Sequence, residues 1–439
     1  MDMEKVVSLC KRRGYIYPSS EIYGGLNSCY DYGPLGAELK RKVKEFWWKS
    51  MTQKHENIEG LDSSILMHPR IWEASGHIQN FTDPLVDCKL CKSRFREDKL
   101  DQSSCPQEKG KIPGQCRGEL TAARQFNLMF KTFMGPVEDQ ANIIFLRPET
   151  AQGIYVNYQN VLTTSRQKIP FGIAQIGKAF RNEITPGNFT FRTREFEQME
   201  MQFFVKPGQD DEVMEYWKTE RRAWYSKLGI HKDKLRFHEH GQGELAHYAK
   251  KAFDIEYEFP FGWSELEGIH NRTDFDLKRH QEFSGKNLQY FEESTKEKFI
   301  PYIVETSAGC DRSILCILTD AFVEDTANER TVLKLAPFIA PIQIAIMPLV
   351  KKDGLPEIAD GIFNDLKSLY SLNRDDSGSI GRRYRRQDEV GTPFCITIDY
   401  DTKTDHAVTV RHRDTMEQKR IPIAEIRSYV EPSLKYPID

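Results

Sequence analysis

The sequence predicts an α+β protein, in which an antiparallel sheet flanked by helices is followed by a smaller C-terminal α/β domain. Two patterns predict this class. Residues 171–204 read as two strands joined by a polar turn, and beyond residue 335 short apolar strands alternate with a helix. The length of 439 residues also exceeds one typical domain. We therefore place domains at residues 1–335 and 336–439, with insertions at about 86–120 and 206–262.

Composition excludes several classes of protein. Apolar residues make up 39% of the chain and aromatic residues 11%, which suits folded cores rather than disorder. The formal net charge is −3, so RNA binding must rest on local basic patches. We find neither the apolar core of a signal peptide nor a membrane-spanning run. Nine cysteines, an odd number, indicate a reducing compartment. We expect a cytoplasmic protein without a membrane partner.

Residues 37–51 predict the first long helix, which follows a Gly-Pro-Leu-Gly turn signal. Leu39, Val43, Phe46 and Trp47 recur at helical spacing and would bury one side of it. We interpret it as a core helix.

Four cysteines follow in the first insertion. Cys88 and Cys91 form a C-x2-C pair, and Cys105 and Cys116 come later. Four thiolates can hold a tetrahedral structural Zn²⁺. The wide spacing between Cys105 and Cys116 fits free thiols in a surface insertion equally well, so both alternatives stay open.

Glu149 stands at a strand-to-helix turn. The apolar run 143–146 predicts a buried strand, and a helix begins after Thr150. Functional side chains are often displayed at such turns. An acid at this position also simply favours the helix dipole, so the residues alone leave its role open.

The segment 171–204 gives the clearest functional signal. Side chains alternate across a strand, so period-two counting assigns each residue to a face. The first strand places two small residues beside a cation and an acid: Gly177, Ala179, Arg181 and Glu183. In the second strand, one face carries Phe196, Gln198, Glu200 and Gln202. The opposite, apolar face carries Met199, Met201 and Phe203. We expect the apolar face to lie on the core.

A polar strand face is usually just solvated. A nucleotide fits this one better, because small residues beside Arg181 leave room above the sheet. Arg181 would bind a phosphate in fork geometry. Phe196 would stack on a base, and Glu183 would accept from an exocyclic amine.

The next segments supply further polar strand faces. Residues 212–227 and 244–249 read as scaffold helices. Glu265 and Glu267 alternate onto one predicted strand face, where paired acids hold a cation or are ordinary surface charges. Glu305 and Ser307 share another strand face, and the small residues 307–309 permit close backbone approach before a helix that Arg312 opens.

The C-terminal part predicts a mixed sheet. Strands are expected at residues 342–349, 396–400 and 407–413, with a helix at 356–372. Residues 382–386 read Arg-Arg-Tyr-Arg-Arg, the densest basic patch of this part. A charge run is usually a solvated face, but a tyrosine among arginines suits RNA through phosphate contacts and base stacking.

These motifs carry a resemblance. Arg181-Asn182-Glu183 and Arg192 through Phe196 reproduce an Arg-x-Glu strand end, a loop, and Arg-x-x-x-Phe. This resembles motif 2 of class II aminoacyl-tRNA synthetases. The sequence RNEITPGNF…REFEQME is similar to that of glycyl-tRNA synthetases of the dimeric α2 type. The resemblance covers nearly the whole chain. It implies a class II catalytic domain at 1–335 and an anticodon-binding domain at 336–439.

The resemblance also implies roles for named residues. Motif 1, the dimer-forming helix, corresponds to the helix at 37–51, and motif 3 to residues 299–323. The implied ATP-binding residues are Arg181, Asn182, Glu183, Phe191, Arg192, Thr193, Arg194, Glu195, Phe196, Glu265, Leu266, Gly309, Cys310, Asp311 and Arg312. The implied glycine-binding residues are Arg96, Glu149, Phe196, Glu197, Gln198, Met199, Glu200, Glu305, Thr306, Ser307, Ala308 and Gly309. Arg181 and Arg312 are the implied catalytic residues. Thr306 departs from the proline common in the family.

The implied function is that of a glycine–tRNA ligase. ATP and Mg²⁺ would activate glycine as glycyl-adenylate, which is then transferred to the 3′ end of tRNA(Gly) by a homodimer. Three alternatives compete: a related binding subunit without catalysis, a ligase for serine, threonine or proline, and an RNA-binding protein. The intact arginines and acids argue against the first, and the wording RPET, EFEQME and ELEG argues against the second. The third leaves residues 140–323 unexplained.

Overall fold

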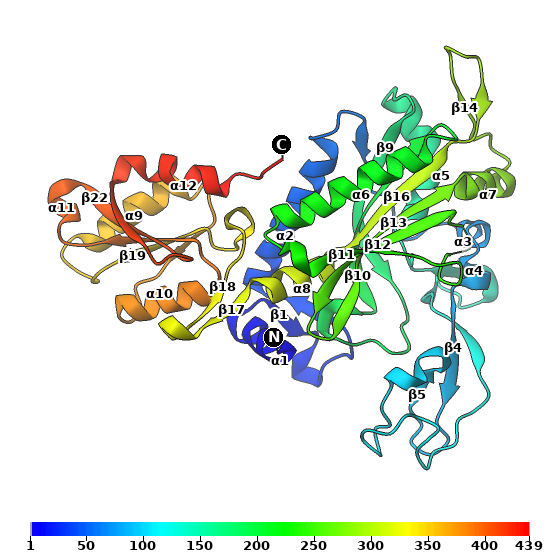
Figure 1. Cartoon of the computed structure of the whole chain (residues 1–439), viewed down its shortest axis with the longest axis horizontal. Coiled ribbons are helices and arrows are strands. Elements are labelled where there is room, and N and C mark those ends of the chain that lie inside the picture. Colours follow the sequence, from blue (N-terminus) through cyan, green and yellow to red (C-terminus); the bar gives the residue numbers. More distant parts are fainter. Residues whose placement is uncertain (1, 247, 439) are drawn as a thin grey trace.

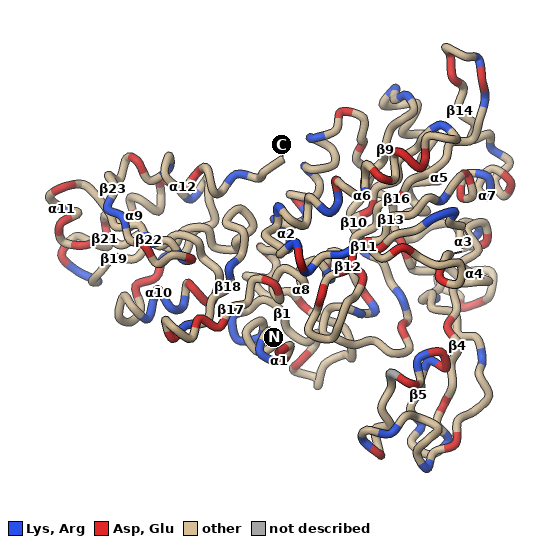
Figure 2. The backbone as a smooth tube through the Cα atoms, in the orientation of Figure 1, with Lys and Arg blue, Asp and Glu red and all other residues tan. Residues whose placement is uncertain are grey.

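A computed structural model describes residues 2–246 and 248–438 of the chain. Figure 1 shows a large N-terminal body and a smaller C-terminal one, joined through the hairpin of β17 (Phe322–Asp325) and β18 (Arg330–Leu333). Figure 2 shows acidic and basic residues interspersed along both bodies, and the two kinds nearly balance in number, with a net charge of −3. None of the described helices is long and apolar enough to cross a membrane.

The large body is built on one seven-stranded sheet. Its strand order is β11-β12-β13-β16-β10-β9-β3, and every neighbouring pair is antiparallel except β3 with β9. The strands are β3 (Ile58–Gly60), β9 (Phe171–Phe180), β10 (Glu195–Val205), β11 (Leu235–Glu239), β12 (Lys251–Phe259), β13 (Gly262–Thr273) and β16 (Tyr302–Gly309). This confirms the predicted α+β class and its antiparallel sheet.

Three helices cover one face of this sheet: α2 (Pro34–Thr52), α6 (Asp210–Lys227) and α8 (Cys310–Ala321). The predicted apolar residues of α2 are fully buried here, and Met199, Met201 and Phe203 of β10 pack against them as predicted. On the opposite face, α5 (Ala151–Thr164) and α7 (Phe275–Ser284) pack over Phe171 and Phe204. They leave the part of that face around the N-terminal half of β10 open.

The segment 206–262 is integrated into this sheet. It supplies α6 and the two strands β11 and β12. The helix predicted at 244–249 is wrong for the described residues, which form turns and irregular structure. Glu244 Oε2 instead accepts a hydrogen bond from the backbone N–H of Gly241 at 2.9 Å. Gly241 and Gly243 precede this segment, and glycine disfavours helix formation.

Residues 82–127 form a small sheet that projects from the large body (Figure 1). Its strands are β4 (Thr82–Asp87), β5 (Arg94–Arg96) and β6 (Arg124–Asn127). The Cys88 sulfur lies 3.5 Å from the Cys91 backbone nitrogen, and all four cysteines of this region are free thiols. Within residues 2–246 and 248–438, no group of three or more His, Cys, Asp or Glu is arranged to hold a metal ion.

The C-terminal body is a mixed five-stranded sheet with its own core. The strand order is β20-β19-β21-β22-β23, parallel around β19 and antiparallel beyond β21. The elements are β19 (Ile344–Pro348), α9 (Leu355–Leu366), β20 (Leu372–Arg374), α10 (Ile380–Glu389), β21 (Phe394–Ile398), β22 (Ala407–His412), β23 (Gln418–Pro422) and α12 (Ile426–Leu434). The predicted α/β pattern is confirmed.

The interpretation of residues 382–386 as one RNA-stacking patch is wrong. Arg383 is buried and donates to the Pro348 carbonyl at 2.7 Å. The Tyr384 hydroxyl lies 2.6 Å from Thr397 Oγ1, so this ring packs on the sheet rather than facing solvent. The segment is helical, and a helix needs one inward face, which Arg383 and Tyr384 provide. Arg382 and Arg385 are its exposed cations.

A buried ionic junction joins the two bodies. Asp388 of α10 is fully buried. It accepts hydrogen bonds from Arg330 of β18 (Arg330–Leu333) at 3.0 Å and from Arg411 of β22 at 2.7 Å. Arg330 also donates to the Arg413 carbonyl at 2.8 Å. The hairpin of β17 (Phe322–Asp325) and β18 is therefore fixed to the C-terminal sheet.

Candidate active site

The open part of the sheet carries a cleft of about 220 Å³. It is lined from β10, β13 and β16, from the chain that follows β9, and from the turn that precedes α5. Predicted residues that line it are Glu149, Arg181, Glu183, Phe191, Arg192, Thr193, Phe196, Glu197, Gln198, Glu200, Glu265, Glu305, Ser307, Gly309, Asp311 and Arg312. Sequence-distant strand ends therefore meet in one place.

Strand register explains this convergence. Gln198 of β10 pairs with Gly177 on one side and Gly309 on the other, and Glu200 pairs with Ser307. Residues paired across neighbouring strands share a face, so these side chains point into the cleft. A side chain at Gly177 would clash with the Arg147 guanidinium, which explains the small residue. Arg181 and Glu183 follow the end of β9 instead of lying within it.

Several predicted residues turn their side chains away from the cleft. Met199, Thr306 and Ala308 stand at the alternate positions of β10 and β16 and face the core. Leu266 and Cys310 are buried in the same core. Asn182, Arg194 and Glu195 lie beside the cleft along the chain, where Arg194 Nη2 donates to the Glu183 carbonyl at 3.1 Å. These positions can offer backbone groups to a ligand.

Arg96 lies outside the cleft, on β5 of the projecting sheet. Its guanidinium pairs with Asp98 at 2.7 Å and with Asp83 at 2.7 Å. The hydrogen bonds that Arg96 donates to Asp98, together with the charges of Asp83 and Glu183, raise the pKa of Arg96. Arg96 therefore stands on the Glu183 side of the cleft, and its contact with glycine stays a prediction.

The prediction that Glu265 and Glu267 share a strand face is wrong. Glu267 pairs with Ile255 but Glu265 pairs with Glu256, so Leu266 is an extra residue in β13. Such a β-bulge reverses the alternation. Glu265 lines the cleft and bonds Arg312 Nη1 at 2.9 Å. Glu267 is fully buried on the other face and accepts from Arg221 Nε of α6 at 2.7 Å.

Five cleft residues were missed by the sequence interpretation: Thr190, Tyr248, Gly268, His270 and Arg272. Three of them, Gly268, His270 and Arg272, follow the bulge at alternate positions of β13. Counting the alternation from Gly268 rather than from Glu265 would have found His270. Arg272 lies at a second irregularity, between Asn271 and Thr273, so its placement depends on β16 as well.

One end of the cleft holds Glu305 beside Arg272 and His270. Its Oε2 accepts from His270 Nδ1 at 2.7 Å and from Arg272 Nη1 at 3.1 Å, while Oε1 accepts from Gln202 Nε2 at 2.8 Å. Burial alone would favour the neutral acid, but Arg272 and His270 outweigh it and lower the pKa of Glu305 to about 2. Glu305 is therefore a permanent negative charge.

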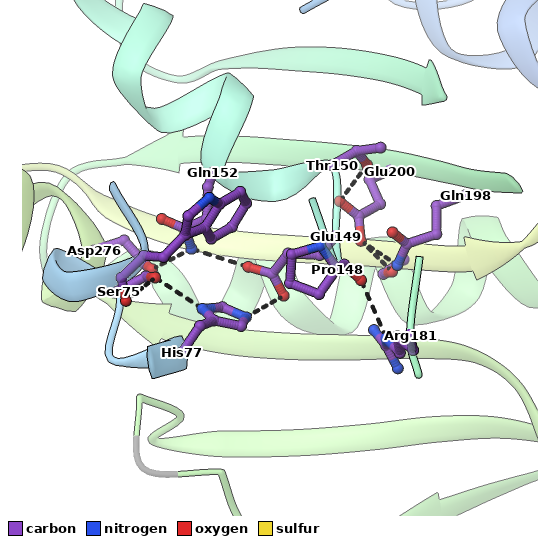
Figure 3. A network of polar contacts seen from close by, with 12 residues as sticks. Ser75, His77, Pro148, Glu149, Thr150, Gln152, Arg181, Gln198, Glu200 and Asp276 are labelled. Atoms are coloured by element: carbon purple, nitrogen blue, oxygen red, sulfur yellow. Dashed lines mark hydrogen bonds and ion pairs between the residues drawn. The ribbon is translucent and has the colours of Figure 1, made fainter. Parts of the chain in front are cut away.

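Glu149 extends from the turn between β8 (Ile143–Phe145) and α5 into the same end of the cleft (Figure 3). Gln152 Nε2 donates to its Oε1 at 2.9 Å, and His77 Nε2 lies 3.4 Å from its Oε2. Against the effect of burial, His77 and then Arg272 hold the pKa of Glu149 well below its usual value. The structure thus gives His77, left unassigned by sequence, a contact with a cleft acid.

Glu200 is the third carboxylate of this end, and it is surrounded differently. Thr150 Oγ1 donates to it at 2.5 Å, Ser307 Oγ at 2.6 Å and Gln198 Nε2 at 2.9 Å. Burial, followed by the charges of Glu305 and Glu149, raises the pKa of Glu200 to about 7. Three acids gathered at one end make it suitable for an organic cation.

The other end of the cleft is cationic. Arg181 Nε donates to the Pro148 carbonyl at 3.1 Å, and its guanidinium lies 5.2 Å from the Phe196 ring centre. Arg312 is held by the Phe191 carbonyl at 3.1 Å as well as by Glu265. The buried Glu183 Oε2 has no hydrogen-bond partner among the described atoms, so it can accept from a ligand.

Comparison with known proteins agrees with this geometry. The family described as "tRNA synthetase class II core domain (G, H, P, S and T)" matches residues 133–321, and "Anticodon binding domain" matches residues 343–432. The chain is 61% identical to the glycine–tRNA ligase of Treponema denticola, over 99% of this chain and 98% of that protein. It is 56% identical to that of Borreliella burgdorferi, over 98% and 97%. For Alkaliphilus oremlandii the identity is 53%, over 99% of both chains. This chain therefore belongs to the glycine–tRNA ligase family of class II aminoacyl-tRNA synthetases.

Proposed function

We propose that the protein activates glycine with ATP and transfers the glycyl group to tRNA(Gly). One observation carries this proposal: a single cleft joins a cationic end, with Arg181 and Arg312, to an end with three carboxylates. A carboxylate oxygen of glycine attacks the α-phosphorus of ATP, and pyrophosphate leaves. The 3′-terminal ribose of tRNA then takes the glycyl group and releases AMP. Such chemistry needs positioning and charge stabilisation rather than a protein nucleophile.

The cationic end is assigned to ATP. Arg181 stabilises charge on the α-phosphate, and Arg192 and Arg312 hold the outer phosphates. Phe196 stacks on adenine, and Glu183 accepts from its exocyclic amine, which suits an Oε2 atom that lies 3.6 Å from Arg192 Nη1 and makes no hydrogen bond among the described atoms. The other residues predicted from sequence to bind ATP, such as Asn182, Arg194 and Glu195, are proposed to act through their backbone groups or through their place in the loop beside the cleft.

The acidic end is assigned to the glycine ammonium. Glu200 and Glu305 are buried around it, Glu149 and Ser307 are partly buried beside them, and charge-assisted hydrogen bonds to carboxylates are strong. Arg272 and Tyr248 fill the space beyond, since the guanidinium lies 3.7 Å from the Tyr248 ring centre. A side chain larger than hydrogen on the substrate would meet these groups, so the cleft selects glycine by exclusion.

Two metals follow from the family resemblance. Mg²⁺ binds ATP sites through one or two carboxylates and the phosphates themselves. Glu265 fits that role, because its side chain is 46% exposed inside the cleft next to Arg312. Mg²⁺ would supply charge neutralisation at the phosphates. We assign no Zn²⁺ to Cys88, Cys91, Cys105 and Cys116, because no group of three or more metal-binding side chains occurs among the described residues.

The partners are proposed on the same basis. The C-terminal body would bind the anticodon arm of tRNA(Gly), which agrees with its family description. The helix α2 matches the dimer-forming helix of the family, so we propose a homodimer. Nine free thiols suit a reducing cytoplasm.

Amino-acid-dependent exchange between ATP and labelled pyrophosphate tests the activity. Each of the twenty amino acids is offered separately to the purified full-length protein. We expect exchange with glycine alone and subsequent charging of tRNA(Gly). Preferential exchange with serine, threonine or proline would establish a different ligase, and no exchange with any amino acid would leave only a binding function.

A further inference from the structure

The three carboxylates of the acidic end have different partners. Glu305 is paired with Arg272 and His270, and Glu149 lies against His77. Glu200 forms no ion pair with any described lysine, arginine or histidine. Its hydrogen-bond donors are all uncharged: the Thr150 and Ser307 hydroxyls and the Gln198 amide. Glu200 is therefore the one of the three acids whose described hydrogen-bond donors are all uncharged.

Thr150 occupies an unusual position for this contact. It is the N-cap residue of α5, where a threonine normally uses its hydroxyl to satisfy a backbone N–H of the first turn. Here the side chain makes no such cap, and the hydroxyl donates to Glu200 at 2.5 Å instead. Thr150 is fully buried, and Figure 3 shows its hydroxyl directed at the Glu200 carboxylate. The helix gives up a capping bond, and Glu200 gains a donor.

The charges that face Glu200 come from β16 and from the turn that precedes α5. Glu305 of β16 and Glu149 of the turn before α5 oppose its ionisation, and Arg147 of the same turn acts in the other sense. Its neighbours Gln198 and Gln202 on β10, and Gln175 on β9, carry no charge. Burial and the two acids raise the pKa of Glu200 to about 7, against the Ser307 and Thr150 hydrogen bonds, which lower it. Of the three acids, Glu200 is thus the one whose surroundings most favour the neutral form.

We propose that glycine binding releases a proton from Glu200, and that Thr150 is the positioning residue that controls this release. The arriving ammonium stabilises the carboxylate form, so the Glu200 O–H bond breaks and its proton passes to water. The carboxylate and the ammonium then form a charge-assisted hydrogen bond. This proposal rests on the proposed function, because it takes glycine as the ligand of the pocket.

The experiment is the pH dependence of the KM for glycine in ATP–pyrophosphate exchange between pH 6 and 8.5. In the wild-type protein, KM should fall up to about tenfold per pH unit below the pKa of Glu200 and then level off. Thr150→Val keeps the shape and removes the donor. In this variant, the pH at which KM levels off (the break) should move to a higher value. The KM for glycine at pH 7 should therefore rise roughly three- to tenfold and return to the wild-type value at pH 8.5.

Three controls complete the test. Thr150→Ser keeps the hydroxyl and should keep the wild-type break. Thr319→Val removes the hydroxyl of another buried threonine, one without a hydrogen-bond partner among the described atoms, and should shift nothing. The KM for ATP should not follow the same pH dependence in Thr150→Val.

Each outcome decides a separate question. A Thr150→Val defect of equal size at every pH would show a purely structural threonine and overturn the proposal. An unshifted break in Thr150→Val, or a break that persists in Glu200→Gln, would also overturn it. Absence of glycine-dependent exchange in the wild-type protein would instead refute the proposed function, which keeps the two failures apart.

Discussion

Single residues in the acidic end differ in charge behaviour because their immediate neighbours differ. Contacts with His77 and Arg272 lower the pKa of Glu149, and contacts with Arg272 and His270 lower that of Glu305, whereas burial and the two other acids raise the pKa of Glu200. His77 contacts Glu149, and its own Nδ1 lies 2.8 Å from the Ser75 hydroxyl. The rings of Trp72 and Phe81 lie beside it. We regard His77 as a positioning residue for Glu149.

The corresponding prediction concerns His77→Phe. Phenylalanine fills the aromatic surroundings but cannot donate to Glu149, so the KM for glycine should rise roughly tenfold while that for ATP changes little. Steady-state exchange kinetics with each substrate varied in turn would measure this. His77→Gln retains a donor and serves as the matched control. Equal losses for glycine and ATP would contradict the positioning role.

Sequence alone predicted part of this site at the residue scale. Alternation along β10 correctly placed Met199 and Met201 on the core and put Glu200 on the opposite face. It did not predict what Thr150 does, because that hydroxyl bonds a residue 50 positions away instead of its own helix. Long-range partners of this kind leave no local pattern.

At the scale of elements, the bulge in β13 decides which acid reaches the cleft. Leu266 is fully buried, and Glu267 is anchored beneath the sheet by Arg221 of α6. The extra residue turns Glu265 to the cleft. Period-two counting could not predict this, since a single inserted residue in a strand reverses every face assignment on one side of it. The segment carrying α6, predicted only as scaffold, thus supports a cleft strand.

Stability measurements on Arg221 and Glu267 test this support. Arg221→Met alone leaves a buried, unpaired carboxylate and should lower the free energy of unfolding by about 3–5 kcal/mol. The double variant Arg221→Met/Glu267→Leu removes both charges and should recover most of that loss. Urea denaturation followed by tryptophan fluorescence would measure both. A double variant as unstable as the single one would show that the charge pair is not the cause.

At the scale of the whole molecule, the two bodies match different family models, the class II core domain and the anticodon binding domain. The cleft lies entirely in the large body, while the C-terminal body is fixed to it through Asp388, Arg330 and Arg411. The domain order and the class of both bodies follow from sequence patterning, because long strands and helices have strong periodicity. The prediction of one basic RNA-binding patch at residues 382–386 was wrong, because packing of the helix turns Arg383 and Tyr384 inward.

Asp388→Ala tests the coupling between the bodies. Two buried arginines would lose their partner, so docking of the C-terminal body should weaken. We expect tRNA charging to fall at least about tenfold more than glycine-dependent exchange, since only charging needs both bodies in register. Asp388→Asn keeps an acceptor and should lose less. A parallel loss of both activities would indicate general unfolding instead.

The most direct test of the account is exchange by Arg181→Ala, measured with saturating glycine and ATP. Arg181 lies in the cationic end of the cleft and donates to the carbonyl of Pro148, the residue before Glu149. The account predicts a fall in exchange rate of about 10²–10³ with an unchanged thermal unfolding midpoint. Undiminished exchange by a folded Arg181→Ala protein would contradict the assignment of this cleft to adenylate formation.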